Sequence, residues 1–542
     1  MSEYKLSVSS LPAKSGEMVE AEVEGLDGAK VLVVNSAGKV QAMGPKCTHY
    51  GGPLTKGVLT TNGRITCPWH GACFSTVTGD VEDAPALDSL PIFRVTERDG
   101  AIYITGDEAR IKAGRRKPGF KCSTTPGDDK VVVVGGGSGA VGAVEGLREK
   151  GFQGGITVIS NEGYLPIDRP KLSKALIPDA SKLALRDEGW YKAGSVDMVQ
   201  DDVVDIDFTA KTAITKKGHK YEYTKLILAT GGIPRNLPLP GFKVLENIFT
   251  LRSVHDVKQI VGSIGDKGKK IVIIGSSFIG MEVANATADG NTVSIVGMEK
   301  APLERVLGEK IGSAVQKGLE AKDIKFYMSA SVDKAEPSKS EPSKVGSVLL
   351  KDGTSLEADL VILGVGVAPA TGFLKDSTVI RLEPDGSIKT DETFSVLGLK
   401  DVYAIGDIAT YPFHGPTGDG KPVRIEHWNV AQNSGRSVAS HIVNPAITPQ
   451  AFTPVFWSAL GAQMRYCGNT QANGWDDLVV QGNPEEGKFA AFYCKGDTVA
   501  AVATMGMDPV MTQAAELMRL HKMPSKATIQ GGLDILSVGS PE

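Results

Sequence analysis

The sequence predicts a multidomain chain, with a small all-β domain first, two α/β units of the βαβ type in the middle, and a separate α+β domain at the end. Three observations lead to this prediction. The length of 542 residues corresponds to roughly three or four domains. Short segments with strand-like alternation fill both ends of the chain. A strand–glycine–helix–strand pattern occurs twice between them, about 140 residues apart.

The composition of the chain excludes several classes of protein. Hydrophobic residues make up 41% and charged residues 23%, which is ordinary globular usage. The net charge of −4 offers no global positive field, so nucleic acid is not expected as a main partner. No run of about 18 apolar residues predicts a membrane span. The six cysteines are too few for a disulfide scaffold, and the first ten residues do not resemble a targeting peptide. We expect a cytoplasmic protein and leave a mitochondrial association open.

The first domain and the segment after it are predicted from turn chemistry. Residues 1–108 are expected to form the all-β domain, with short strands between Gly, Asp and Asn turns at 30–34, 39–42, 64–66, 92–95 and 101–104. Residues 109–128 are first basic and then rich in Gly, Pro, Ser and Thr, without hydrophobic periodicity. This composition predicts a linker.

The remaining elements follow from periodicity. The first βαβ unit is expected as a strand at 131–134, a helix to residue 150 and a strand at 156–160. The second has a strand at 271–274, a helix to about residue 289 and a strand at 292–296. Strands that end in glycine are expected at 226–228, 360–363 and 402–405, as at a ligand-facing sheet edge. The last domain is expected to have strands at 462–467, 478–481, 489–493 and 498–503, and a helix at 510–520.

Two cysteine–histidine pairs form the strongest chemical motif. Cys47 and His49 lie on one loop, and Cys67 and His70 lie on a second loop with Gly and Pro neighbours. Two thiolates on one iron and two imidazoles on the other make a Rieske [2Fe–2S] centre. A structural zinc site is the main alternative, although its usual order places two Cys before two His. The remaining alternative is four unrelated loop residues, which would make both spacings accidental.

The two loops also resemble those of a known domain. Cys-Thr-His followed by Cys-Pro-Trp-His-Gly is similar to the ligand loops of Rieske ferredoxin domains. High-potential Rieske proteins carry an extra, disulfide-forming cysteine in each loop, whereas this chain has Gly52 and Trp69 at those places. The resemblance implies a lower-potential ferredoxin type. The other cysteines are expected to be small buried residues, namely Cys73, Cys122, Cys467 and Cys494.

The first glycine loop follows the expected strand at 131–134. Gly135, Gly137 and Ala140 match G-x-G-x-x-G/A, in which the first two glycines allow the turn and the approach of a pyrophosphate to the helix N-terminus. A glycine-rich turn without a ligand is the alternative. The ribose-binding acid is expected at Glu162, with Asn161 as a substitute.

The second glycine loop departs from this pattern. Gly275 and Gly280 flank Ser277, which stands at the middle glycine position and adds a Cβ atom. The expected acid is Glu299, although Gly297 departs from the usual pattern and Lys300 would favour a 2′-phosphate. The choice between NADH and NADPH stays open, with NADH favoured.

Two such units in one chain resemble the two-dinucleotide-binding flavoproteins, with FAD on the first unit and NAD(P)H on the second. Thr230 and Gly231, and then Gly406 and Asp407, are similar to the further FAD motifs of that family. Many of its members pass electrons through a C-x-x-x-x-C disulfide. This chain has no cysteine between positions 122 and 467, so we expect one-electron exit from the flavin.

A third motif narrows the resemblance. Residues 165–174, LPIDRPKLSK, resemble a signature of apoptosis-inducing factor and of oxygenase-coupled ferredoxin reductases. The resemblance implies flavin contacts at Arg169 and Lys174. It also implies that Glu282 pairs with that Lys and that Phe278 lies at the flavin–nicotinamide junction. Lys174, Glu282 and Phe278 are the candidate catalytic residues. Aromatic loops over the flavin are expected at Trp428 and Trp457; without the resemblance, both would be read as core aromatics.

With its N-terminal domain, the chain resembles the Rieske-bearing apoptosis-inducing factor-like flavoproteins. The resemblance implies a Rieske domain at 1–108, an FAD-binding domain at 129–247 and 374–445, an NAD(P)H-binding domain at 248–373 and a reductase domain at 446–542. The expected function is electron transfer from NAD(P)H through FAD to the fused cluster and then to an unknown acceptor, either a small molecule or a redox protein. The alternative is a redox-dependent signalling or apoptosis-effector protein with low turnover. The sequence leaves the oligomeric state open.

Overall fold

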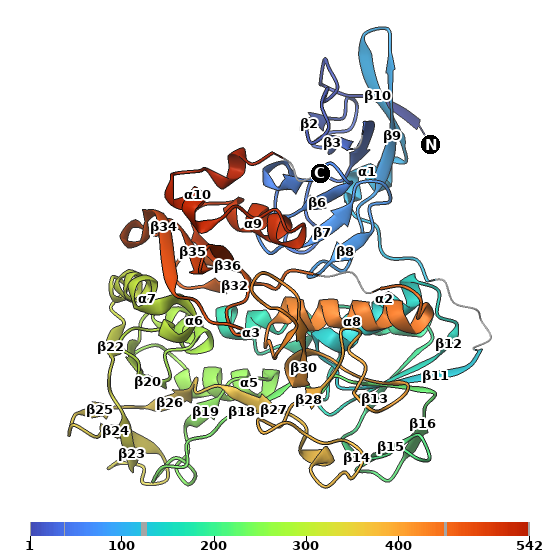
Figure 1. The fold of residues 1–542 in the computed structure, drawn as a ribbon. Coiled ribbons are helices and arrows are strands. Elements are labelled where there is room, and N and C mark those ends of the chain that lie inside the picture. The colour runs from blue at the N-terminus through green and yellow to red at the C-terminus, as the bar shows by residue number, and fades with distance from the viewer. Residues whose placement is uncertain (1, 37, 121–126, 449–451, 540–542) are drawn as a thin grey trace.

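The computed structural model describes residues 2–36, 38–120, 127–448 and 452–539 of the chain. An N-terminal β domain lies at one end of the molecule, against the terminal domain and the first α/β unit, while the second α/β unit lies farther away (Figure 1). This architecture confirms the expected fold class. Within the described ranges, no helix combines the length and the apolar character needed to cross a bilayer.

The N-terminal domain has two antiparallel sheets. The larger has the order β1–β10–β9–β4–β3–β2, and the smaller has the order β5–β6–β7–β8. The strands of the larger sheet are β1 (Ser2–Lys5), β2 (Met18–Glu22), β3 (Lys30–Ser36), β4 (Lys39–Met43), β9 (Ile92–Arg98) and β10 (Ala101–Gly106). Those of the smaller are β5 (Val58–Leu59), β6 (Arg64–Thr66), β7 (Cys73–Ser75) and β8 (Val81–Asp83), after a short turn η1 (Leu54–Lys56).

Strand β3 is buried on both faces. Leu32 and Val34 pack into the core beneath the smaller sheet, while Val31 and Val33 pack into a second core on the opposite face. This alternation is the period of two that a strand imposes on its side chains. The larger sheet therefore joins two small cores and supports the loops that carry the cysteine–histidine pairs.

The segment expected to be a linker begins with a helix, α1 (Glu108–Ala113). The Asp107 side chain accepts a hydrogen bond from the backbone N–H of Arg110, and Gly114 ends the helix at φ 61°. Both are ordinary helix-capping features. One buried residue, Ile111, anchors this helix, so hydrophobic periodicity could not indicate it.

The first α/β unit contains a parallel sheet in the order β13–β12–β11–β17–β29. Its strands are β11 (Gly127–Val134), β12 (Gly154–Ser160), β13 (Val196–Gln200), β17 (Lys225–Leu228) and β29 (Val402–Ala404). Helices α2 (Ser138–Glu149) and α8 (Trp428–Val443) pack side by side (Figure 1). A Cβ at Gly142 would lie 2.1 Å from the Gln432 carbonyl oxygen, so this close helix packing requires glycine.

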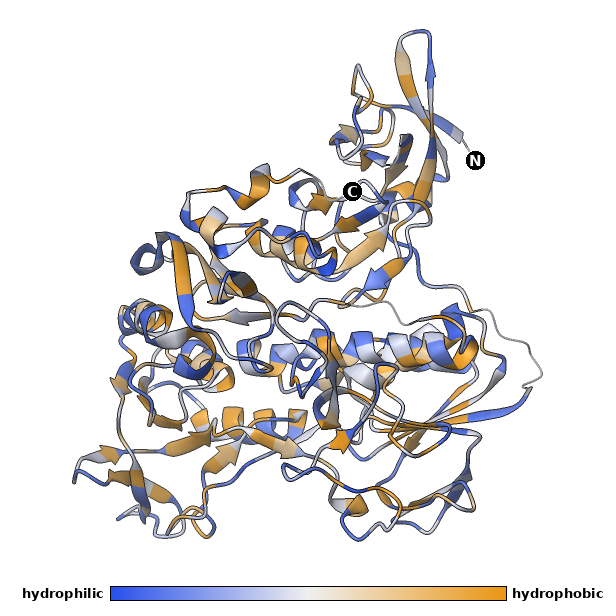
Figure 2. Ribbon diagram, viewed as in Figure 1, coloured by the Kyte–Doolittle hydropathy of each residue, from blue (hydrophilic) through white to orange (hydrophobic). Residues whose placement is uncertain are grey.

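Smaller elements complete this unit. They are α3 (Pro170–Ala175), η2 (Ala180–Lys182), α4 (Glu188–Ala193), β14 (Val203–Asp207), β15 (Thr212–Thr215), β16 (Lys220–Glu222), η3 (Gly372–Leu374), β28 (Ile388–Lys389), η4 (Gly406–Ile408), β30 (Ala409–Phe413) and β31 (Lys421–Val423). Apolar residues gather on the central strands of both α/β units, where helices or small sheets cover them (Figure 2).

The second α/β unit contains a parallel sheet in the order β19–β26–β20–β21–β22. Its strands are β19 (Ile248–Thr250), β20 (Lys270–Ile274), β21 (Thr292–Val296), β22 (Lys325–Tyr327) and β26 (Leu360–Leu363). Its helices are α5 (Val254–Ile264), α6 (Phe278–Thr287) and α7 (Glu304–Glu320). A three-stranded sheet of β23 (Val332–Pro337), β24 (Val345–Leu350) and β25 (Ser355–Glu357) flanks it. A two-stranded antiparallel sheet of β18 (Gly232–Pro234) and β27 (Val367–Pro369) lies where the chain passes between the two units.

The terminal domain is one antiparallel sheet with helices on one face. Its strand order is β32–β33–β36–β35–β34. The strands are β32 (Val455–Ala459), β33 (Gln463–Gly468), β34 (Asp477–Asn483), β35 (Lys488–Lys495) and β36 (Thr498–Met505), with η5 (Pro484–Glu486), α9 (Val510–Arg519), α10 (Lys526–Gln530) and η6 (Ile535–Ser537). In β35, Phe489 and Tyr493 face the core of the second α/β unit, while Ala490 and Phe492 face α9.

The N-terminal domain docks on the other domains through buried polar contacts. Asn429 and Asn433 of α8 bond the backbone of Ala84 at 2.8 Å each. Arg436 of the same helix donates to the Val81 carbonyl at 2.7 Å. Arg465 of β33 donates to the Trp69 carbonyl at 2.8 Å. The Arg465 bond holds the second cysteine–histidine loop against the terminal domain, while the bonds of α8 hold residues 81–84 against the first α/β unit.

Candidate functional site

The two loops with the cysteine–histidine pairs have the same backbone turn. The Cys47 N–H donates to the Gly52 carbonyl and the Cys67 N–H donates to the Ala72 carbonyl, both at 2.8 Å. Each loop contains a glycine in the left-handed region, with φ 78° at Gly51 and φ 74° at Gly71. The repeated turn presents one thiol and one imidazole from each loop toward the other loop.

The four side chains meet as two pairs. The Nδ1 atoms of His49 and His70 lie 3.2 Å apart, and the thiols of Cys47 and Cys67 share a hydrogen bond. The four ligand atoms of the two loops do not form one tight group. Among the described residues, three metal-ligating atoms lie within 4.8 Å of one another only at Cys73, Asp83 and Glu516. A single tetrahedral zinc would draw its four ligand atoms closer than that. Two separated pairs fit a two-iron centre with one ligand type on each iron.

The protonation of these groups suits metal ligation. Burial lowers the pKa of His49 to about 4 and that of His70 to about 2, so both rings are neutral at neutral pH. The hydrogen bond from Cys47 lowers the pKa of Cys67. The backbone N–H groups of His49, Tyr50, Trp69 and His70 donate to the two sulfurs. Neutral imidazole and thiolate are the forms that bind metal, and such N–H donors tune a cluster's potential.

A cavity of about 780 Å³ opens at the carboxyl ends of β11, β17 and β29. Gly135 and Gly137 line it. Gly135 has φ 112°, and a Cβ there would lie 2.2 Å from the Ala229 carbonyl oxygen, so the turn requires glycine. A Cβ at Gly137 would meet nothing within 4 Å, which leaves open space at the N-terminus of α2. The size and the free helix N-terminus fit a dinucleotide pyrophosphate.

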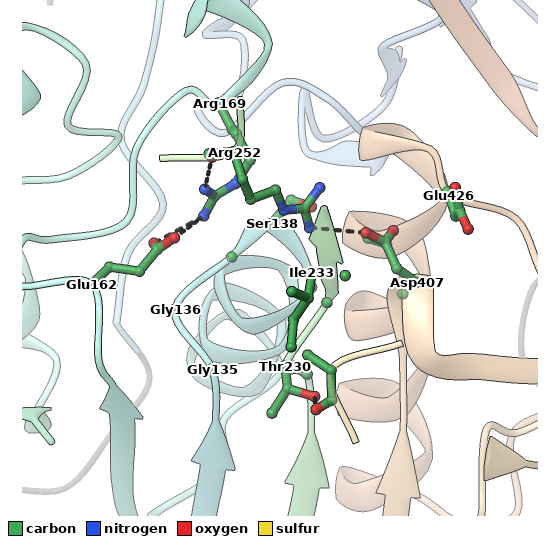
Figure 3. Close-up of a pocket in the computed structure, with 18 of the residues that line it drawn as sticks. Gly135, Gly136, Ser138, Glu162, Arg169, Thr230, Ile233, Arg252, Asp407 and Glu426 are labelled. Atoms are coloured by element: carbon green, nitrogen blue, oxygen red, sulfur yellow. Dashed lines mark hydrogen bonds and ion pairs between the residues drawn. The ribbon is translucent and has the colours of Figure 1, made fainter. Parts of the chain in front are cut away.

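Ion pairs line the cavity (Figure 3). Both Glu162 carboxylate oxygens accept from Arg169, at 2.7 and 2.8 Å, and Arg169 also donates to the Arg252 carbonyl at 2.6 Å. The Arg252 guanidinium lies 2.9 Å from the Asp407 carboxylate. Sequence reasoning missed Arg252, which lies in an ordinary loop after β19 and matches none of the motifs quoted above. Thr230, Gly231, Gly406, Trp428 and Trp457 also line the cavity, whereas Ala140 lies inside α2 and does not.

A second group of residues occupies the side of the cavity toward α6. Lys174 Nζ lies 2.9 Å from the Glu282 carboxylate, which is 4% exposed. Glu282 also accepts from the Ser173 hydroxyl at 2.5 Å and the Ser458 hydroxyl at 2.6 Å. Phe278 meets Phe456 with ring centroids 4.6 Å apart. The structure therefore brings the three candidate catalytic residues together, and it adds Ser458, which the sequence did not indicate.

The structure shows why a serine, Ser277, can occupy the middle glycine position of the second glycine loop. Ser277 caps helix α6 at φ −77°, which any residue can adopt, and its hydroxyl donates to the Gly364 carbonyl at 2.8 Å. Gly275 and Gly280 are needed for packing, because a Cβ on either would lie 2.3 Å from a carbonyl oxygen. The Glu299 carboxylate accepts from Ser276 of this loop at 3.3 Å, at the end of β21 where a ribose-binding acid is expected.

One tryptophan connects the two candidate centres. The Trp457 ring lies 4.5 Å from the His70 ring and 5.8 Å from the His49 ring, measured between centroids. Trp457 also lines the large cavity. Next to it, the Tyr50 hydroxyl donates to Asp168, which belongs to the signature segment before α3. These contacts close the histidine side of the two loops against the reductase.

The remaining cysteines are buried and free at Cys73, Cys467 and Cys494. This agrees with their expected role as small core residues. Cys122 lies outside the described residues.

Comparisons with known proteins give the same three parts. The Rieske [2Fe-2S] domain matches residues 5–94, the pyridine nucleotide-disulphide oxidoreductase family matches 129–435, and the reductase C-terminal domain matches 455–531. Apoptosis-inducing factor 3 from Homo sapiens is 38% identical over 525 residues, which cover 95% of this chain and 84% of that protein.

Two further comparisons cover the reductase part. Rubredoxin-NAD(+) reductase from Pseudomonas putida is 31% identical over 384 residues, or 70% of this chain and 96% of that protein. The crystal structure of the covalent putidaredoxin reductase–putidaredoxin complex superposes with a TM-score of 0.69 at 27% identity, covering 74% of this chain and 96% of that chain. The chain therefore belongs to the pyridine nucleotide-disulphide oxidoreductase family, as an FAD-dependent NAD(P)H oxidoreductase with an N-terminal Rieske domain.

Proposed function

We propose that the chain transfers electrons from NAD(P)H through FAD to its own Rieske cluster, and from there to an external acceptor. When bound, FAD accepts a hydride and can release electrons singly, and the two-iron cluster accepts one electron at a time. The observation that supports this order is Trp457, which contacts His70 and also lines the cavity that fits FAD. A carrier tethered within the same chain has an effective concentration in about the millimolar range.

The proposed roles of the cluster loops follow from their chemistry. Cys47 and Cys67 would supply the thiolates, and His49 and His70 the imidazoles, because three of the four are buried, His49 is half-buried, and they meet as like pairs. The docking contacts of α8 and β33 keep this centre beside Trp457. We also propose the domain boundaries given above with one change: the linker, expected at 109–128, would begin only after α1 ends at Ala113.

The proposed roles in the large cavity divide between binding and positioning. The residues that would leave room for FAD to lie close to the protein backbone are Gly135, Gly137, Thr230, Gly231 and Gly406. Those that would contact its polar groups are Glu162, Arg169 and Asp407. Lys174 and Glu282 form an ion pair on the side of the cavity that Phe278 lines, where nicotinamide and flavin would meet. The two serine donors fix the Glu282 carboxylate and hence the position of the Lys174 ammonium.

NADH is the proposed electron donor. Glu299 follows β21, and there its carboxylate would accept from a 2′-hydroxyl and repel a 2′-phosphate; the ion pair with Arg305 at 3.0 Å would offset the charge of that arginine. Lys300 is 71% exposed and lies near Glu309 instead. We propose a reducing compartment such as the cytoplasm, because the five described cysteines are all free and buried.

Anaerobic titration with NADH tests the proposed order. Reconstituted holoenzyme should contain about two irons per chain, and NADH should bleach the flavin and then generate the EPR signal of a reduced cluster. Zinc in place of iron, or flavin that bleaches while the cluster stays oxidised, would contradict the proposal. Slow turnover with every acceptor, together with an NADH-dependent change in oligomeric state, would favour the signalling alternative.

A substitution at the connecting tryptophan tests the route. Trp457→Leu should slow cluster reduction relative to flavin reduction by about tenfold, because it removes the ring between His70 and the cavity. Rapid mixing with NADH separates the two rates. The matched control is Trp475→Leu, since Trp475 packs against Tyr493 in the same domain and touches neither centre. Equal slowing in both variants would show a packing defect rather than a route.

A further inference from the structure

A second, smaller pocket lies beside the Rieske ligand His49. It has a volume of about 210 Å³ and is distinct from the large cavity, although Trp428 lines both. Thr48, His49 and Tyr50 form one wall, and the segment around η2 with the signature residue Lys171 forms the other. The volume is below the range of roughly 300–1,000 Å³ that is usual for drug-sized ligands. The pocket therefore suits a small molecule.

The lining of this pocket includes an unpartnered amide. Gln432 of α8 is 2% exposed, and both its Oε1 and Nε2 atoms lack a hydrogen-bond partner. A buried amide with neither atom bonded costs about 1–3 kcal/mol relative to a satisfied one. Because Gln432 lines the pocket, an oxygen of a bound molecule could accept from Nε2, and a hydroxyl on that molecule could donate to Oε1.

The rim of the pocket is positively charged. Four cations line it, Arg115, Lys171, Lys182 and Arg186, against two carboxylates, Asp88 and Asp168. Three of these cations are paired: Arg186 bonds to Glu145, Asp88 and the Leu87 carbonyl, Arg115 lies 3.5 Å from Asp88, and Lys171 lies 3.1 Å from Asp168. Lys182 has no carboxylate within 4.0 Å in the described part of the chain. The surplus charge favours an anion.

We propose that this pocket binds a small organic or inorganic oxyanion against His49. Resting on the proposed function, we further propose that the physiological anion is the electron acceptor, a small anionic one-electron oxidant. The histidine side of the cluster loops is closed by Trp457 and Asp168, so a protein acceptor would not reach His49 without undocking the domain. One NAD(P)H would then reduce two acceptor anions, giving NAD(P)⁺ and one proton, with each acceptor gaining one negative charge.

Binding to the oxidised holoenzyme tests the pocket without turnover. Isothermal titration uses malonate as the organic probe and phosphate as the inorganic probe, and visible circular dichroism reports on the cluster environment. We expect saturable binding of at least one probe and a change in the dichroism of the cluster, because His49 forms the pocket wall. Malonate binding alone would indicate a carboxylate ligand, and phosphate binding alone an inorganic oxyanion; either supports the site.

Two variants assign the binding to this pocket. Gln432→Leu should weaken the probe about tenfold, and Lys182→Gln about fivefold, while Lys192→Gln, an exposed lysine on α4, should leave the affinity unchanged. Gln432→Leu breaks no hydrogen bond of the protein, so its melting temperature without anion should be equal or higher. A purely structural role for Gln432 would lower it instead and would overturn the proposal.

The outcomes separate this inference from the proposed function. If NADH reduces the cluster but neither probe binds, or binding persists in both variants, the pocket proposal is wrong. If a probe binds as predicted but NADH never reduces the cluster, the proposed electron route fails and the anion site stands. If electrons leave only to an added redox protein, at a rate unaffected by saturating malonate, the acceptor role is overturned.

Discussion

Glu282 shows how much one residue organises at the candidate site. Its carboxylate is buried, pairs with Lys174 and accepts from Ser173 and Ser458, so these contacts join three separate parts of the chain when Glu282 itself is included. Such a carboxylate holds an ammonium in a fixed place at the side of the cavity that Phe278 lines. Removing its charge therefore alters both the stability of the site and the position of Lys174.

Glu282→Gln should lower the free energy of unfolding by about 2 kcal/mol, because the partly buried Lys174 ammonium loses its partner. The rate of flavin reduction by NADH should fall with it, since the amide holds the ammonium less firmly. Chemical denaturation and stopped-flow absorbance measure the two effects. Lys192→Gln, which removes an exposed charge on α4, is the control. Unchanged stability and an unchanged rate in the Gln variant would refute this role.

His427 makes the stability depend on pH. Burial lowers its pKa from 6.5 to about 4, so between these values the unfolded chain binds more protons than the folded chain. Its contribution to stability is full above pH 6.5 and is lost as the pH falls through 4. His427→Gln should flatten the melting temperature between pH 4 and 6.5 relative to wild type. His521→Asn, at an exposed position with φ 55°, should not. Parallel pH curves for all three proteins would contradict the prediction.

For single residues, the sequence indicated those that belong to motifs better than those that matter through their contacts. Cys47, His49, Lys174 and Glu282 were each indicated by a pattern of neighbouring residue types. Arg252 was not, because a single arginine in a loop carries no spacing, and its partner Asp407 is 155 residues away. The unpartnered amide of Gln432 could not be predicted either, since the sequence does not show which polar groups lack hydrogen-bond partners.

Among the elements, β6, β8 and α9 meet in a buried ionic cluster. Arg64 is 4% exposed and contacts Asp83, Glu82 at 2.5 Å and Glu516 at 3.6 Å. Glu516 also accepts from the Thr66 hydroxyl at 2.9 Å. Because Glu516 belongs to α9 and the others to the N-terminal domain, this cluster ties the Rieske domain to the terminal domain.

Arg64→Met should therefore destabilise the protein by about 3 kcal/mol, because it leaves the partly buried Glu82 and Asp83 without a cation, while Glu516 keeps Arg519 at 2.8 Å. The N-terminal domain should also loosen, so that limited proteolysis cuts near residues 108–128 sooner. Arg98→Met removes an exposed arginine that pairs with Glu3 and should change little. If the two variants melt and are cleaved alike, the cluster does not fasten the domain.

The elements themselves were largely predictable, and the exceptions have physical reasons. Strands β11, β12, β20 and β21 match the expected segments because continuous apolar runs indicate buried parallel strands. Helix α1 was missed because one apolar residue, Ile111, gives no periodicity. The contact of α9 with β6 lies 450 residues apart in sequence, and no local pattern encodes such a distance.

At the scale of the whole molecule, the Rieske domain lies at one end and contacts α8, α9 and Asp168 just before α3 (Figure 1). The polar contacts on all three sides are part of one folded chain. The electron route should therefore be intramolecular, and the docked arrangement should be present in every molecule.

The rate of cluster reduction after mixing with NADH should consequently be independent of protein concentration over about a hundredfold range. It should also respond weakly to salt, because the docking contacts are buried. Stopped-flow mixing at several dilutions measures this. Rates that rise in proportion to protein concentration would mean that the Rieske domain of one molecule serves the reductase of another.

Strand β35 gives the design a particular vulnerability. Phe489 and Tyr493 face the nucleotide-binding unit, while Ala490 and Phe492 face the helix that bears Glu516. Inserting one amino acid into this strand would exchange the two sets, since neighbouring side chains point to opposite faces. Packing against the second α/β unit and packing against α9 would be lost by the same event, so length changes during evolution should accumulate in the surrounding turns instead.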